Sequence, residues 1–287
     1  MAKSRDIHRR MRSVDNTRKI TRTMEMVATA KLRQAQGRVV EARPYSQHLI
    51  DVIGRLATPE LAELQPLLRQ PERIERAAVI LITSNRGLCG AFNANLIRTA
   101  QSELAELRDE GVATEFHVYG NKGISYFRFR GVDMTTSRND LGDPPAPDDA
   151  RSVIEELARR FIDEEIDAVR LVFAEFRNMV STPPTVRQLL PVGLGERSGP
   201  QPYYILDPSA DAILERLLPL YVRNATFSAL LETSAAEQAA RRTAMKSATD
   251  NAEEFLKKLR RNYNRARQAE ITNQIAEIIG GADALEE

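Results

Sequence analysis

Apolar positions at both ends of the chain follow the spacing of long α-helices. Between about residues 2 and 57, apolar or small residues recur at alternating steps of three and four, which places them on one helical face. This row contains Ile7, Met11, Val14, Ala28, Leu32, Ala35, Val39, Ala42, Leu49, Ile53 and Leu56. A similar row from about 208 to 284 contains Leu217, Leu220, Phe227, Leu231, Met245, Ala248, Ala252, Phe255, Leu259, Ala266 and Ala269. At ~1.5 Å per residue, the two predicted helices span roughly 80 and 110 Å, so each must shelter its stripe against the other or against a partner.

Each stripe has polar interruptions. In the N-terminal helix the register becomes polar at Arg18, Thr21 and Glu25, while the neighbouring face carries Ile20, Met24 and Val27. In the C-terminal helix the polar positions are Asn224, Ser234, Gln238 and Arg241. A polar band of this kind is typical of a surface that moves against other proteins, and a local packing irregularity explains it equally well.

Helix-breaking residues set expectations for where the two helices bend and end. Pro44 is expected to bend the first helix or to separate it from a second segment, and Pro219 to kink the last helix. The Gly280–Gly281 pair predicts the end of that helix.

The middle of the chain alternates between two other patterns. Apolar runs at 77–84, 113–120 and 167–176 predict buried strands, and amphipathic stretches at 93–110, 121–129 and 148–163 predict helices between them. This alternation predicts a Rossmann-like α/β domain with a mostly parallel sheet. The predicted fold class is therefore α/β, with a long helix at each end of the chain. The predicted divisions are the N-terminal helix at 1–57, a connector at 58–76, the α/β domain at 77–207 and the C-terminal helix at 208–287.

Charge and cysteine content exclude several classes of protein. The 41 basic and 40 acidic residues leave a net charge of +1, which does not indicate a nucleic-acid-binding protein. The first 43 residues, however, carry twelve Lys or Arg against four acids, so this end favours acidic surfaces. A single cysteine excludes an intramolecular disulfide, and three scattered histidines show no metal-ligand spacing. We predict no metal site, no membrane span and no removable leader, although a basic start can imitate a transit peptide.

The segment NRGLCGAFN (85–93) follows a predicted strand and precedes a predicted helix. Its backbone N–H groups could hold an anion, but it lacks the GxGxxG pattern and the Lys and Ser or Thr of a P-loop. Cys89 at a helix N-terminus could be a nucleophile, although no base lies nearby in sequence and a buried cysteine is the favoured interpretation. The third interpretation is a turn in which Gly87 and Gly90 allow a sharp reversal.

Four long segments resemble the gamma subunit of the F-type ATP synthase. They begin with IHRRMRSVDNTRKITRTMEMVATAKLRQAQ, continue with ITSNRGLCGAFN and VSTPPTVRQLLP, and end with EQAARRTAMKSATDNAEEFLKKLRRNYNRARQAEITNQIAEIIGGA. The resemblance implies a non-catalytic rotor shaft, an antiparallel coiled coil of the two terminal helices, inside a ring of three alpha and three beta subunits, with epsilon and the membrane c-ring at its foot. It also implies ATP synthesis or hydrolysis coupled to ion flow, with the catalytic sites in beta and no catalytic or cofactor site in this chain. The expected location is the cytoplasmic face of the bacterial cell membrane, with membrane association only through the c-ring.

The resemblance also implies roles for individual residues. Those expected to contact the alpha and beta head are Arg18, Lys19, Thr21, Met24, Met26, Arg241, Arg267, Gln268 and Thr272. The turn near beta is expected to carry Arg86, Gly87 and Cys89, and the foot near epsilon and the c-ring Tyr204 and Asp207. Photosynthetic relatives carry a two-cysteine insertion that regulates rotation, and a chain with Cys89 alone cannot form that switch.

Two other functions remain open from the sequence. The first is a nucleotide-dependent α/β enzyme that uses the glycine turn and dimerises through a helical arm. The second is a coiled-coil adaptor or nucleic-acid-binding arm, suggested by a stretch that mixes Arg261, Arg265, Arg267 and Gln268 with apolar residues at helical spacing. Interleaved acidic residues in the same stretch weaken the nucleic-acid hypothesis.

Overall fold

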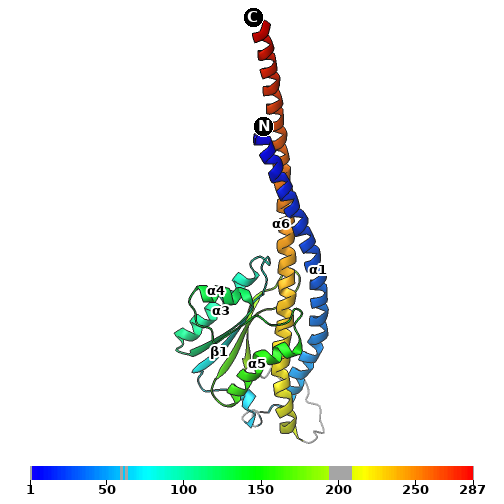
Figure 1. Ribbon diagram of the computed structural model, residues 1–287. Coiled ribbons are helices and arrows are strands. Elements are labelled where there is room, and N and C mark those ends of the chain that lie inside the picture. The colour runs from blue at the N-terminus through cyan, green and yellow to red at the C-terminus, as the bar shows by residue number, and fades with distance from the viewer. Residues whose placement is uncertain (1, 59–60, 62–63, 194–208, 287) are drawn as a thin grey trace. The chain divides into compact units, whose positions relative to one another are not determined.

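The computed structural model describes residues 2–58, 61, 64–193 and 209–286. The chain forms two compact units. Unit 1 consists of Met1–Ala28 and Arg242–Glu287, and unit 2 of Thr29–Arg241. The two long helices α1 (Ala2–Leu56) and α6 (Ala210–Glu286) contribute a segment to each unit (Figure 1).

Both predicted terminal helices are confirmed, and they are more continuous than predicted. Helix α1 runs through Pro44 without a break, so the hypothesis of a second segment after this proline is wrong. Helix α6 likewise runs through Pro219, and it continues past Gly280 and Gly281, which do not end it. Glycine weakens a helix by only about 1 kcal/mol relative to alanine, so the pair permits an end without imposing one.

Unit 2 contains a five-stranded sheet with the order β3-β2-β1-β4-β5. The strands are β1 (Arg76–Ile82), β2 (Ala113–Tyr119), β3 (Thr136–Arg138), β4 (Ala168–Ala174) and β5 (Pro184–Leu190). The first four are parallel to their neighbours, whereas β5 pairs antiparallel with β4. Strands β1, β2 and β4 were predicted because most of their residues are apolar. The prediction missed β3, which has three residues, and β5, whose proline and polar residues conceal it.

The helices of the α/β layer are α3 (Phe92–Asp109), α4 (Asn121–Phe129) and α5 (Pro147–Ile162), each within one residue of its predicted bounds. A short 3₁₀ helix, η1 (Pro66–Leu68), precedes the first strand. Helices α3 and α4 cover one face of the sheet, and α5 and the first part of α6 cover the other (Figure 1).

The central strand β1 has two buried faces. Ala78, Ile80 and Ile82 belong to the core cluster shared with α5, η1 and the start of α6. The alternate residues Ala77, Val79 and Leu81 belong to the cluster shared with α3 and α4. Side chains of a strand point alternately to opposite faces. A strand that is covered on both faces therefore reads as the continuous apolar run seen in the sequence.

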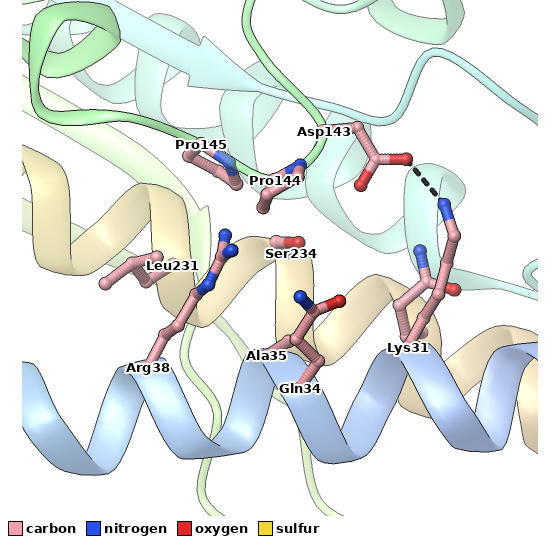
Figure 2. Close-up of a pocket in the computed structure, with 10 residues that line it drawn as sticks. Lys31, Gln34, Ala35, Arg38, Asp143, Pro144, Pro145, Leu231 and Ser234 are labelled. Carbon is pink, nitrogen blue, oxygen red and sulfur yellow. Dashed lines mark hydrogen bonds and ion pairs between the residues drawn. The ribbon is translucent and has the colours of Figure 1, made fainter.

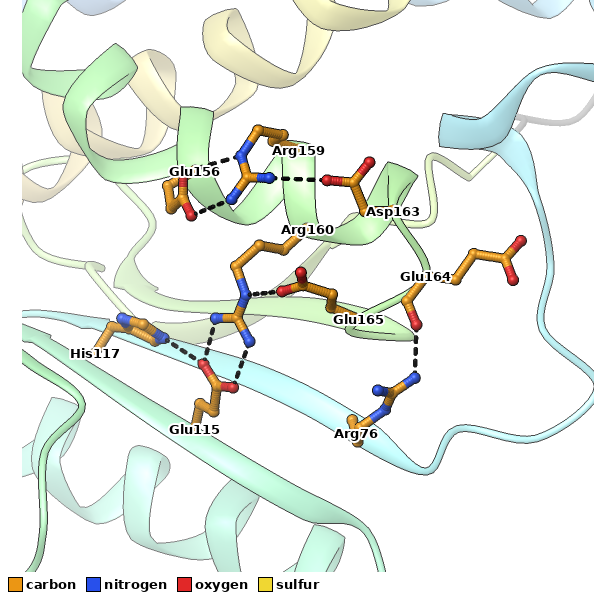
Figure 3. Close-up of polar contacts among 9 residues, drawn as sticks. All are labelled: Arg76, Glu115, His117, Glu156, Arg159, Arg160, Asp163, Glu164 and Glu165. Atoms are coloured by element: carbon orange, nitrogen blue, oxygen red, sulfur yellow. Dashed lines mark hydrogen bonds and ion pairs between the residues drawn. The ribbon is translucent and has the colours of Figure 1, made fainter.

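An ion-pair network fastens the end of α5 to the sheet (Figure 3). Both oxygens of Glu115 on β2 accept hydrogen bonds from the Arg160 guanidinium at 2.7 Å, and the Arg160 Nε donates to Glu165 at 2.8 Å. The Arg160 hydrogen bonds hold the pKa of Glu115 below its usual value. Burial lowers the pKa of His117, whose Nε2 lies 3.6 Å from the same carboxylate. The bidentate geometry fixes the position of α5 over β2.

None of the helices in residues 2–58, 61, 64–193 and 209–286 is both long enough and apolar enough to cross a membrane.

Candidate functional site

In unit 1, α1 and α6 pack as an antiparallel pair. The buried α6 residues follow steps of four and three: Met245, Thr249, Ala252, Leu256 and Leu259. Half-buried and buried residues of α1 follow the same steps: Ile7, Met11, Val14, Arg18, Thr21, Glu25 and Ala28. This is the seven-residue repeat of a coiled coil, and it confirms the predicted helix pair. The seam is the line of buried side chains along which α1 and α6 meet. The prediction that Phe255 belongs to the stripe is wrong, because Phe255 is 51% exposed and its neighbour Leu256 packs in the seam.

The seam becomes polar where the sequence analysis placed the polar band. The hydroxyl oxygens of Thr21 and Thr249 lie 2.8 Å apart, and both residues are buried. Each hydroxyl also lies close to a carbonyl on its own helix, that of Arg18 for Thr21 and that of Met245 for Thr249. One threonine can donate across the seam while the other donates to its own helix, so both protons are used. The pair is thus a satisfied polar contact inside the coiled coil.

Ion pairs flank the threonine pair. The Arg18 guanidinium contacts Asp15 on its own helix at 2.9 Å and Glu253 on α6 at 3.3 Å. Asp15 also pairs with Lys19 at 2.9 Å. Hydrogen bonds from Lys19 and Arg18 hold the pKa of Asp15 below its usual value. Arg18 therefore links the helices, whereas Lys19 stays exposed.

Beside this seam, α1 presents apolar side chains to solvent. Ile20, Met26 and Val27 are 59%, 59% and 54% exposed, and Met24 is half-buried. Ile20 and Val27 are seven residues apart and share one face with Met24, whereas Met26 shares a different face with Lys19. Ile20 and Val27 were recognised as a neighbouring face but not as site residues. Their seven-residue separation is the signal that could have identified them.

The remaining predicted contact residues of α6 in unit 1 are on its surface. Arg267, Gln268 and Thr272 are all exposed, and the Thr272 hydroxyl donates to the Gln268 carbonyl at 3.0 Å. The same stretch exposes isoleucines that the sequence analysis did not single out: Ile271, Ile275, Ile278 and Ile279.

In unit 2, the segment between β1 and α3 forms the predicted turn. The reversal uses positive φ angles at Leu88 (63°) and Gly90 (59°). Gly87 does not adopt a positive φ, so its predicted role in the reversal is wrong and Leu88 takes that role instead. A leucine in this conformation is strained. Leu88 is also 61% exposed, and the adjacent Arg86 is exposed.

Cys89 is part of the packing under the turn. It is 2% exposed, and the Asn93 side-chain amide donates to its sulfur at 3.2 Å. Asn93 also accepts a hydrogen bond from the backbone N–H of Ser84 at 3.0 Å, which ties the start of α3 to the end of β1. Burial raises the pKa of the Cys89 thiol. These features confirm the interpretation of Cys89 as a buried residue, because a nucleophilic cysteine requires a lowered pKa.

Arg241 holds the turn against α6. Its guanidinium donates to the Gly87 carbonyl at 3.3 Å and to Glu237 at 2.5 Å. Arg241 is 9% exposed, and burial raises the pKa of Glu237. Arg241 and Gly87 were both predicted as site residues, but their contact with each other was not predicted. Their separation of 154 residues left no local signal for it.

Tyr204 and Asp207 were predicted for the foot, and no metal site was predicted. Tyr204 and Asp207 lie outside the described residues. Within the described part of the chain, no group of three or more His, Cys, Asp or Glu residues could hold a metal ion.

Comparison with known proteins decides the family. The family model described as ATP synthase matches residues 3–285. The ATP synthase gamma chain of Gemmatimonas aurantiaca is 52% identical over 100% of both chains. The ATP synthase gamma chain of Desulforamulus reducens is 44% identical, again over 100% of both. The chain belongs to the ATP synthase gamma chain family.

Solved structures agree with the fold of the gamma chain family. The rotor of the Euglena gracilis mitochondrial ATP synthase aligns with a TM-score of 0.67 at 19% identity, over 94% of this chain and 99% of that one. The central stalk and c-ring structure of the Tetrahymena thermophila enzyme gives a TM-score of 0.60 at 22% identity, over 80% of this chain and 99% of that one. At these identities the similarity shows the shared fold, a pair of long helices with an α/β layer.

Proposed function

We propose that this gamma chain is the central stalk of an F-type ATP synthase, a rotor that couples ion flow through a membrane ring to ATP synthesis or hydrolysis in an alpha and beta head. The observation that carries the proposal is the full-length identity of 52% to a gamma chain, with no part of either chain left unmatched. The coiled coil of unit 1 supports it, because this helix pair carries side chains on its surface that a partner could bind.

The rotor function requires an asymmetric surface. A rotating shaft drives a catalytic subunit only if each of its orientations binds one conformation of that subunit more tightly than the others. A shaft with equal affinity for all conformations shifts no population. Unit 1 provides unequal faces, since Ile20 and Val27 lie on one face and Lys19 with Met26 on another.

We assign the contact with the head to the residues predicted from the family resemblance and to their exposed apolar neighbours. In unit 1 these are Arg18, Lys19, Thr21, Met24, Met26, Arg267, Gln268 and Thr272, to which we add Ile20 and Val27. Thr21 is buried in the seam, so its role is to shape the band and not to touch a partner. In unit 2, Arg241 acts by holding the turn, whose exposed Arg86 and Leu88 are available to a beta subunit.

The remaining parts of the proposal follow from the family. The chain is non-catalytic, and its partners are three alpha subunits, three beta subunits, epsilon and the c-ring. Tyr204 and Asp207 belong to the foot that meets epsilon and the c-ring. The chain divides into an N-terminal helix that ends at residue 57, a connector that ends at 76, an α/β domain that ends at 207 and a C-terminal helix. The assembly lies on the cytoplasmic face of the bacterial cell membrane and touches the membrane through the c-ring.

Reconstitution tests the function. The purified chain alone is expected to hydrolyse no ATP, and with alpha and beta from the same organism it is expected to form a complex that does. Hydrolysis and assembly are measured on the same gel-filtration fraction, with alpha and beta alone as the control. ATP turnover by the isolated chain, or failure to enter a complex with alpha and beta, would contradict the proposal.

A further inference from the structure

A small cavity lies in unit 2 between α1, α6 and the loop at 143–145 (Figure 2). Its volume is about 100 Å³. Arg38 and Gln34 extend from α1 toward this loop, and Ser234 faces them from α6. The polar residues that line the cavity are Lys31, Gln34, Arg38, Asp143, Ser234 and Gln238. None of them has a part in the stalk function proposed above.

The charges around the cavity do not balance. Lys31 and Asp143 form an ion pair at 2.9 Å and neutralise each other. Arg38 is half-buried, and within the described part of the chain its guanidinium has no hydrogen-bond or ion-pair partner. The cavity therefore keeps one uncompensated positive charge. A buried or half-buried guanidinium normally pairs with a carboxylate or another anion.

A second observation points to the same space. Gln238 lines the cavity and is only 4% exposed, yet its side-chain amide has no hydrogen-bond partner among the described residues. Neither polar atom of this amide is sealed within the protein, so both can bind water or a ligand in the cavity. Gln34 and Ser234 also lack a partner among the residues that the structure describes. Four side chains with N–H or O–H donors thus surround one small space.

We propose that this cavity binds a single small oxyanion of the phosphate class. Arg38 supplies the charge and a planar pair of N–H donors that suits two oxygens of a tetrahedral anion. Gln34, Gln238 and Ser234 supply further donors for the remaining oxygens. Asp143 stays paired with Lys31, so its carboxylate does not repel the ligand. The site adds a ligand to the stalk and requires no chemistry there.

The size of the cavity limits which oxyanion fits. Liquid water occupies about 30 Å³ per molecule, so the cavity holds about three waters or one tetrahedral anion. A phosphate group can come from inorganic phosphate or from a nucleotide. The cavity accommodates the phosphate group, and its described lining offers no aromatic side chain on which a nucleobase could stack, so inorganic phosphate is the ligand that we propose.

Equilibrium dialysis of the purified full chain against radiolabelled inorganic phosphate, at constant ionic strength in chloride, tests the site. We expect saturable binding of one phosphate per chain. Arg38→Gln should weaken that binding at least tenfold, and Ser234→Ala severalfold. Arg33→Gln is the matched control, because Arg33 is exposed on the same helix and does not line the cavity. Circular dichroism verifies the fold of each variant, and Ser234→Ala carries the test if Arg38→Gln unfolds.

Each other outcome overturns the proposal. Non-saturable binding would mean that the cavity holds only water, and equal affinity in the wild-type and Arg38→Gln chains would place any bound phosphate elsewhere. Dialysis against AMP separates the two sources of phosphate. AMP should bind no more tightly than inorganic phosphate and adenosine not at all, whereas tenfold tighter AMP binding would identify a nucleotide site instead.

Discussion

The hydroxyl groups of Thr21 and Thr249 meet at 2.8 Å inside the coiled coil of unit 1, at a position where a repeat of this kind usually places two apolar side chains. Each hydroxyl has a carbonyl on its own helix as a second partner, so the pair satisfies itself without water. A polar pair at a seam position can fix the register of two helices at a cost in stability.

Replacing either threonine of this pair by valine should lower the local free energy of unfolding slightly. Replacing both should lower it by less than the sum of the two single losses. Each single variant loses the cross-seam hydrogen bond, at about 0.5–1 kcal/mol, while the remaining hydroxyl still donates to its own helix. In the double variant two apolar groups of the same shape face each other. Amide hydrogen exchange over the helix segments around both sites measures the local free energies, and additive losses would show that the two hydroxyls are not coupled.

Arg241→Met should destabilise unit 2 by about 1–3 kcal/mol at pH 8, because it removes the partner of the buried Glu237. Burial already raises the pKa of Glu237, and Arg241 opposes this effect. A carboxyl group whose pKa is higher in the folded than in the unfolded chain stabilises the fold at a pH below its pKa in the unfolded chain. This stabilisation is lost as the pH rises through its pKa in the folded chain. Without Arg241 the folded pKa rises further, so the loss should be smaller at pH 5 than at pH 8.

Urea denaturation of the full chain at the two pH values checks this second prediction. Lys246→Met is the control, since Lys246 and Asp250 form an exposed pair on the same helix and the change should cost about 0–0.5 kcal/mol. Adding Glu237→Gln to Arg241→Met should restore part of the stability. A loss that is the same at pH 5 and pH 8 would show that the charge on Glu237 is not its cause.

Glu115→Gln should weaken the attachment of α5 to the sheet by about 1–2 kcal/mol at pH 7, because the bidentate pair with Arg160 becomes a single weaker contact. Arg160 lowers the pKa of Glu115 from 4.5. A carboxyl group with a lowered pKa stabilises the fold above its unfolded pKa and loses this effect as the pH falls through the folded value. The difference between variant and wild type should therefore persist at pH 6 and shrink once the pH is below 4.5.

Thermal unfolding followed by circular dichroism across this pH range measures the difference. Glu156→Gln provides the comparison, because Glu156 and Arg159 form an exposed pair on the same helix. It should shift the transition much less than Glu115→Gln at pH 7. Equal shifts for the two variants would mean that the bidentate contact to β2 adds nothing beyond a surface ion pair.

Met24→Lys should impair coupling more than assembly. Met24 is half-buried beside the polar band, so a lysine there can keep its charged end in water while adding a positive charge to the proposed contact surface. In membranes that carry the assembled complex, ATP hydrolysis should persist while ATP-driven ion pumping falls severalfold. Tyr45→Lys, at an exposed position of the same helix in unit 2, should change neither. Equal losses of assembly and pumping would contradict the assignment.

The sequence by itself determined the two long helices, the three apolar strands and the three helices between them. These elements follow from local spacing, because a period of three and four or a continuous apolar run depends on neighbours in the chain. Local pattern also located the polar band, since Arg18, Thr21 and Glu25 fall on the same register as the apolar residues around them. The limits of this reasoning are equally local, as shown by β5 and by the choice of Leu256 over Phe255 for the seam.

Only the tertiary structure decided which distant groups meet. The contact of Arg241 with Gly87, the pairing of Thr21 with Thr249 and the lining of one cavity by Arg38 and Ser234 each join segments far apart in sequence. The positive φ of Leu88, which leucine rarely adopts, lies next to such a long-range contact, because Arg241 donates a hydrogen bond to the carbonyl of the preceding residue, Gly87. Long-range packing selects these arrangements, and no local periodicity encodes them.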